Sequence, residues 1–67
     1  MYVTNARHLR GVHSASGLSL QDFAAQHGIK YASLAKWIKS NVKIRSGTAR
    51  KLRAEFGKTA VYEVIDA

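Results

Sequence analysis

Apolar residues recur at helical spacing in four stretches of the chain, separated by short breaks containing glycine or serine. Residues three and four positions apart lie on one face of an α-helix, so each stretch predicts an amphipathic helix. The predicted helices cover Thr4–His13, 20–27, Tyr31–Ser40 and Ser46–Phe56. The pattern therefore predicts a compact, mainly α-helical fold with four helices.

Two of these helices have clear predicted ends. Ser19 is a good N-cap for the second helix, and Asp22, three residues later, stands where a capping box has its acidic or amide partner. Gly28 follows that helix as its C-cap, where a left-handed backbone favours glycine. For the fourth helix, Ser46 is the predicted N-cap and Gly57 the stop.

The third predicted helix places Leu34, Trp37 and Ile38 in one apolar stripe. Sharing this stripe makes Trp37 a core residue in preference to one that stacks on bases. After the break that follows this helix, Val42 and Ile44 are predicted to anchor a loop.

The last segment, Thr59–Ile65, is rich in β-forming residues and has no helical punctuation, so it predicts a strand. A strand is not stable without a partner. Within the chain only Tyr2 and Val3 resemble one, so a second copy of the protein is the natural candidate. We therefore divide the chain into a helical domain, 1–58, and a dimerisation segment, 59–67. The dimerisation candidates are Val61, Tyr62, Val64 and Ile65.

Composition makes this small fold strongly basic. The 67 residues carry a formal net charge of +7, and the stretch from Ala35 to Lys58 has eight Lys or Arg against Glu55 alone. Such a concentration of charge attracts polyanions, of which nucleic acid is the commonest in the cytoplasm, although a solvated basic face is the alternative. Cysteine is absent, and no apolar run has the length of a signal peptide or membrane span. We expect a cytoplasmic, nucleoid-associated protein that does not interact with membranes.

The sequence gives little support for catalysis or metal binding. His8 and His13 are five residues apart, which differs from the four-residue spacing of helical metal ligands, and His27 has no Cys or acidic partner at ligand spacing. The four acidic residues are unpaired, and no nucleophile motif or phosphate-binding loop is present. We predict no enzyme activity, no metal, no cofactor and no small-molecule substrate.

The spacing of small, apolar and glycine residues from Leu9 to Phe56 resembles that of the lambda-repressor-like helix-turn-helix family, the Cro and repressor type. The residues carrying the resemblance are Leu9-Arg10, Gly17-Leu18-Ser19, Phe23-Ala24, Gly28-Ile29, Leu34, Trp37 and Ala49-Arg50-Lys51-Leu52. The chain departs from the family pattern at three positions. Leu20 replaces the usual Gln, His27 an apolar residue, and Lys30 the Ser or Thr that caps the recognition helix.

The resemblance implies that residues 1–58 form a DNA-binding domain whose third helix enters the major groove. Lys can bind guanine edges, and Tyr or Ala can contact a thymine methyl, although Tyr31 covering the edge of the core is the alternative. The candidate base contacts are Lys30, Tyr31, Ala32, Ser33 and Lys36. The candidate phosphate contacts are Ser19, Gln21, Lys39, Lys43 and Arg45.

We therefore expect a sequence-specific transcriptional regulator, a Cro-like repressor of phage or mobile-element type. It is expected to bind a palindromic operator in double-stranded DNA as a homodimer and to repress by occluding a promoter. Two alternatives remain open at this stage. One is an architectural, excisionase-like recombination factor, and the other is an antitoxin-like or inhibitor-like module that binds a protein.

Overall fold

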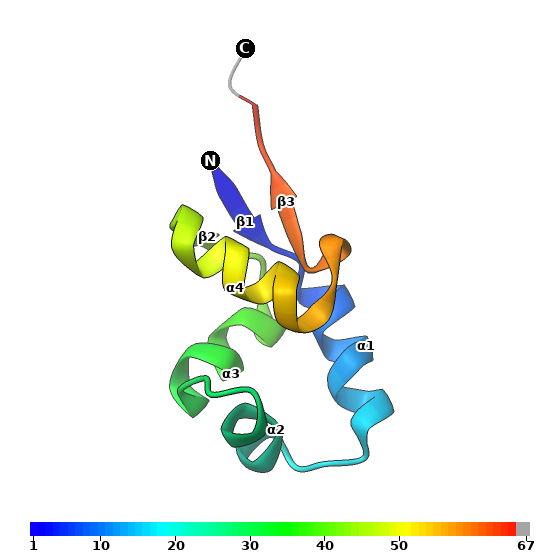
Figure 1. Ribbon diagram of the computed structural model, residues 1–67. Helices are drawn as coiled ribbons and strands as arrows, with labels where there is room; N and C mark the ends of the chain where they lie inside the picture. The colour runs from blue at the N-terminus through cyan, green and yellow to red at the C-terminus, as the bar shows by residue number, and fades with distance from the viewer. Residues whose placement is uncertain (66–67) are drawn as a thin grey trace.

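A computed structural model describes residues 1–65 as four helices and a small sheet (Figure 1). The elements in chain order are β1 (Tyr2–Thr4), α1 (Ala6–Ser16), α2 (Leu20–Gln26), α3 (Tyr31–Lys39), β2 (Lys43–Ile44), α4 (Ser46–Phe56), the 3-10 turn η1 (Lys58–Ala60) and β3 (Val61–Glu63). The sheet lies at one end of the molecule and α2 at the other (Figure 1). The predicted mainly helical fold is confirmed, with each of the four helices near its predicted position.

The first helix begins two residues later than predicted and ends three residues later. The side chain of Asn5 caps it by accepting a 3.3 Å hydrogen bond from the His8 amide. Asn41, from the loop after α3, accepts a hydrogen bond from the Ala6 amide at 2.9 Å. The helix continues to Ser16 because the left-handed residue that ends it is Gly17, with φ of 69°.

The predicted N-cap of α2, Ser19, is confirmed, whereas its C-cap is His27 and Gly28 follows as the left-handed residue of the turn. The Ser19 hydroxyl accepts a hydrogen bond from the Asp22 amide at 3.1 Å, and Gly28 adopts φ of 66°. The Ile29 amide then donates to the Ala24 carbonyl at 2.9 Å, which closes the turn and starts α3 in a new direction. The predicted left-handed conformation of Gly28 is therefore confirmed.

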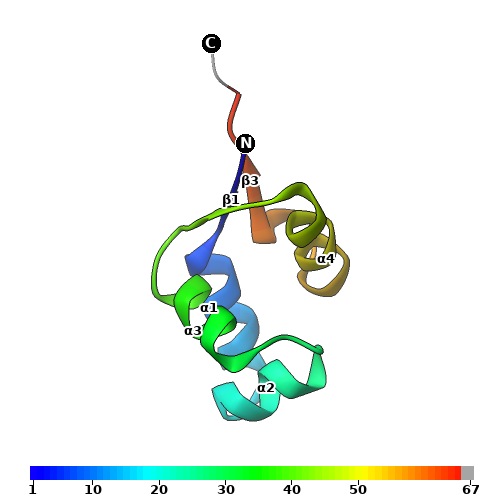
Figure 2. The same cartoon turned by 90° about the vertical axis from the view of Figure 1, so that its left-hand side faces the viewer.

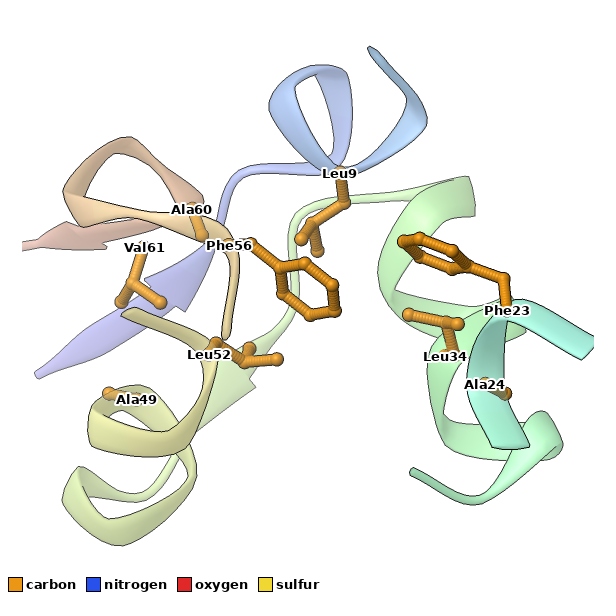
Figure 3. Close-up of a cluster of buried hydrophobic side chains, with 9 residues drawn as sticks. All are labelled: Leu9, Phe23, Ala24, Leu34, Ala49, Leu52, Phe56, Ala60 and Val61. Carbon is orange, nitrogen blue, oxygen red and sulfur yellow. The ribbon is translucent and has the colours of Figure 1, made fainter. Parts of the chain in front are cut away.

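A single core joins the helices to the sheet. In Figure 3 the Phe56 ring lies between Leu9 and Leu52 and faces Phe23, and the centroids of the two rings are 5.5 Å apart. The cluster extends into the C-terminal segment, because Ala60 and Val61 are only 0% and 4% exposed. Two residues of the segment 59–67, Ala60 and Val61, therefore belong to the helical core.

The expectation that a second copy of the protein supplies the partner of the C-terminal strand is corrected, because the partner is β1, which contains the Tyr2 and Val3 noted as the one resemblance within the chain. The sheet has the order β2-β1-β3, and β3 pairs antiparallel with β1 (Figure 1). The pairing places Val3 opposite Tyr62 and Thr4 opposite Val61. The strand is shorter than the predicted Thr59–Ile65 because η1 occupies residues 58–60.

Two further expectations are corrected beside α4. The predicted loop at 42–44 contains the two-residue strand β2, in which Lys43 and Ile44 pair with Val3 and Tyr2 of β1. Ser46 is the first residue of α4 and not its cap; Arg45 occupies the N-cap position, and no side chain caps this end. Among residues 1–65, no helix combines the length and apolar character that a bilayer crossing demands.

Candidate nucleic-acid interface

Contacts with the core and with α1 hold α3 in position, and a contact with α4 holds the turn before it. Leu34 is fully buried, and Trp37 and Ile38 are half-buried against the same core. At the C-terminal end of α3, Arg10 of α1 donates to the Ile38 carbonyl at 2.7 Å. Before its N-terminal end, Lys51 of α4 donates to the Gly28 carbonyl at 3.0 Å. A basic side chain of α1 therefore binds the end of α3, and a basic side chain of α4 binds the turn before it.

The opposite side of α3 is exposed and basic. Ala32, Lys36 and Lys39 are exposed at spacings of four and three residues, which places them on one face. Tyr31, in the first turn, is 54% exposed, which disfavours the alternative that its ring covers the core. In Figure 2 this helix lies toward the viewer, with the segment that carries β2 passing in front of the sheet.

The basic character continues beyond the helix. Lys43 in β2 and Arg45 at the start of α4 are both exposed. We call the exposed residues of this region the α3 surface: Tyr31, Ala32, Lys36, Lys39, Lys43 and Arg45.

The part of the chain that contains α3 has no acidic residue. No Asp or Glu occurs between Asp22 and Glu55, a stretch that carries eight Lys and Arg residues. Glu55 lies at the far end of α4 and pairs with His27 at 3.2 Å, the one ion pair among residues 1–65. The cationic side chains of α3 are thus left without carboxylate partners in the described part of the chain, which favours an external anion.

Two of the predicted base-contact residues lie on a different side of α3. Lys30 and Ser33, with Trp37, face a groove between the start of α3 and the first half of α4. The groove has a volume of about 280 Å³. We call it the α3–α4 groove; its lining residues are Gly28, Ile29, Lys30, Ser33, Trp37, Gly47, Thr48 and Lys51.

The α4 residues of this groove were not predicted as site residues. Thr48 and Lys51 stand one helical turn apart on α4, and the charge run that includes Lys51 was the only signal available in the sequence. The position of Lys51 against the turn before α3 depends on packing between segments 23 residues apart.

The remaining phosphate candidates, Ser19 and Gln21, are exposed at the start of α2. The Ser19 hydroxyl already accepts the capping hydrogen bond from Asp22, although its proton remains available to an acceptor. Gln21 has an exposed side chain in the first turn of the helix, where backbone amides also point outward.

The dimerisation candidates divide into two groups. Tyr62, Val64 and Ile65 are exposed, Ile65 by 85%, whereas the Val61 side chain belongs to the core. The Val64 amide donates to the Met1 carbonyl at 2.8 Å, and the Asn5 amide donates to Ala60 at 2.9 Å. Hydrogen-bonded pairs alternate along an antiparallel ladder, so the amide of Glu63 points away from β1.

The histidines have structural partners. Nε2 of His8 lies 2.8 Å from the Phe56 carbonyl, and Nε2 of His13 lies 2.9 Å from the Leu18 carbonyl. His27 packs edge-on against Phe23 as well as pairing with Glu55. Within residues 1–65, no three His, Asp or Glu side chains come together as a metal-binding group.

Comparison of this chain with protein-family models, with curated proteins and with solved structures finds no match.

Proposed function

We propose that this protein binds double-stranded DNA by inserting α3 into the major groove. The observation that carries the proposal is the α3 surface: an exposed helix face with Lys36 and Lys39, followed in the chain by the exposed Lys43 and Arg45, in a stretch without acidic residues. The major groove of B-DNA admits an α-helix. Ala32 and Lys36 then approach base edges, while cations at the end of α3 and beyond it approach phosphates.

The arrangement of α2 and α3 supports this mode of binding. A short turn closed by Gly28 joins the two helices, and the second helix exposes its polar face while Leu34 is buried. These features support a helix-turn-helix interpretation, in which the second helix reads DNA. The proposed function is sequence-specific regulation of transcription, with repression resulting from occlusion of a promoter.

The proposed form on DNA is a homodimer. Two copies meet along the outer edge of β3, where the Glu63 amide points outward and Tyr62, Val64 and Ile65 are exposed. A two-fold axis places the two α3 helices in successive major grooves, about 34 Å apart, and calls for a palindromic site. The charged Glu63 at this edge is the feature that argues for a monomer, because natural sheets use such residues to prevent edge pairing.

The first test is selection from random DNA duplexes, with affinities then measured between about 50 and 200 mM salt. An enriched inverted repeat, bound with an affinity that falls as salt increases, is the expected result. Binding without enrichment of any sequence would indicate an architectural DNA-binding protein instead of a sequence-specific regulator. The absence of saturable binding would overturn the proposal and favour a protein partner.

A further inference from the structure

The α3–α4 groove is lined by apolar, cationic and hydroxyl-bearing side chains. Ile29 and Trp37 are half-buried and provide apolar surface. Lys30 and Ser33 come from the α3 side. The α4 side contributes backbone at Gly47 and the side chains of Thr48 and Lys51. The groove thus has donors on both sides and no acidic residue in its lining.

A hydrogen bond holds the Lys51 side chain in the lining of this groove. Its ammonium lies 3.0 Å from the Gly28 carbonyl, and a Cβ built on Gly28 would be 3.7 Å from the same nitrogen. A lysine ammonium has three protons, so the hydrogen bond to Gly28 leaves two for another acceptor. Fixing the long side chain in advance lowers the entropy lost when an anion binds.

A DNA phosphodiester suits this combination of groups. Its two non-bridging oxygens accept hydrogen bonds and share one negative charge, which matches the ammonium of Lys51 and the hydroxyls of Thr48 and Ser33. The deoxyribose rings on either side of the phosphate present apolar carbon, which matches Ile29 and Trp37. Since Ser33 lies in α3 and Lys30 is its N-cap residue, a DNA strand that borders this helix in the major groove passes the mouth of the α3–α4 groove.

We propose that the α3–α4 groove binds one phosphodiester of the DNA backbone, with Lys51 as its principal cation. This inference rests on the proposed DNA-binding function and adds α4 to the interface. It assigns to Lys51 a role distinct from that of the α3 surface: it anchors the protein on the backbone and does not read bases.

The test compares the salt dependence of DNA binding for the wild-type chain and for Lys51→Met, which keeps an unbranched apolar stem and removes the charge. The slope of log K against log salt concentration is negative, and loss of one phosphate contact reduces its magnitude by about 0.9. We expect that decrease, with an equal loss of affinity for a selected site and an unrelated duplex. Lys58→Met in η1 removes the same charge away from α3 and serves as the matched control, with an unchanged slope.

Lys51→Arg keeps the charge and is expected to retain the wild-type slope. Such retention shows that a cationic donor at this position is sufficient, since Arg can donate both to a phosphate and to the Gly28 carbonyl. If Lys51→Met and Lys58→Met change the slope equally while the wild-type chain binds DNA, the groove assignment is wrong and the proposed function stands. If the wild-type chain does not bind DNA, both fail.

Trp37 provides an independent readout, since it is the only tryptophan and lines the groove. Its fluorescence is expected to change on titration with duplex DNA, and this change is expected to be lost in Lys51→Met. Inorganic phosphate is the probe for a small-anion site. Saturation of the Trp37 signal by micromolar inorganic phosphate would overturn the assignment to the DNA backbone.

Discussion

Arg10 in α1 donates a hydrogen bond from Nη1 to the carbonyl oxygen of Ile38 in the last turn of α3, across 2.7 Å. The last carbonyls of a helix have no amide partner within it, and a cation near them also complements the helix dipole. This contact links α1, which carries part of the core, to the orientation of the helix proposed to enter DNA. On the other side, Lys51 of α4 donates to the Gly28 carbonyl in the turn before α3.

Replacing Arg10 by Met should therefore loosen the C-terminal end of α3. We expect the free energy of unfolding to fall by about 1 kcal/mol, the usual net value of one hydrogen bond. Urea denaturation followed by circular dichroism measures the change. Arg7→Met, on the same helix at another exposed position, is the control and should change stability by less than about 0.5 kcal/mol. Equal effects of the two substitutions would show that the Ile38 contact contributes nothing specific.

Lys36→Ala tests the reading of bases by α3. The side chain is exposed on the same face as Ala32 and Lys39. Removing a base contact is expected to weaken binding to a selected site by about 1–3 kcal/mol and to relax the preference at one base pair of each half-site. Affinities for the selected duplex and its single-base variants provide the measurement, with Lys58→Ala as the charge control. A loss of equal size on all duplexes would make Lys36 a phosphate contact.

The sequence predicted those parts of the fold whose signals are local. Helix α3 was predicted to within one residue because the stripe of Leu34, Trp37 and Ile38 follows the helical period. The fold of the turn at Gly28 was predicted because a left-handed residue strongly favours glycine. In both cases the cause and its effect lie within a few residues of each other.

The start of α1 was misplaced although its N-cap, Asn5, is a local signal. The other missed features depend on residues far apart in the chain, as does the hydrogen bond from the Ala6 amide to Asn41, 35 residues away. Strand β2 is only two residues long and exists because β1 pairs with it. The place of Lys51 in the candidate site likewise depends on the approach of α4 to Gly28, which no local pattern encodes.

Two glycines provide opposite predictions for stability. Gly11 lies inside α1, where an added Cβ would meet nothing within 4 Å, so Gly11→Ala should stabilise the protein by about 0.5–1 kcal/mol. Gly28 has φ of 66°, a conformation that costs other residues about 1–2 kcal/mol, so Gly28→Ala should destabilise it. Thermal unfolding of both variants beside the wild-type chain measures the two shifts. A lower unfolding temperature for Gly11→Ala than for the wild-type chain would contradict the open environment of that position.

The outward direction of the Glu63 amide allows pairing between two copies of β3 to be tested. The ladder between β1 and β3 directs the Glu63 amide away from β1, so Glu63→Pro removes a donor from the outer edge while leaving the hydrogen bonds to β1 in place. If two copies pair through β3, this substitution should convert the dimer into a folded monomer. Sedimentation equilibrium measures the mass, and circular dichroism confirms that the helices remain.

Glu63→Ala is the matched control for this change. It removes the same carboxylate and keeps the backbone amide, so the dimer should persist. Because a charged side chain at a sheet edge opposes pairing, its removal should make the dimer more stable. A Glu63→Pro variant that remains a folded dimer would show that the dimer contact lies elsewhere. A monomeric wild-type chain would exclude pairing between the β3 strands of two copies. Because each monomer has one α3, the Glu63→Pro monomer should bind a single half-site with the affinity of one reading helix, well below that of the dimer for the complete palindrome.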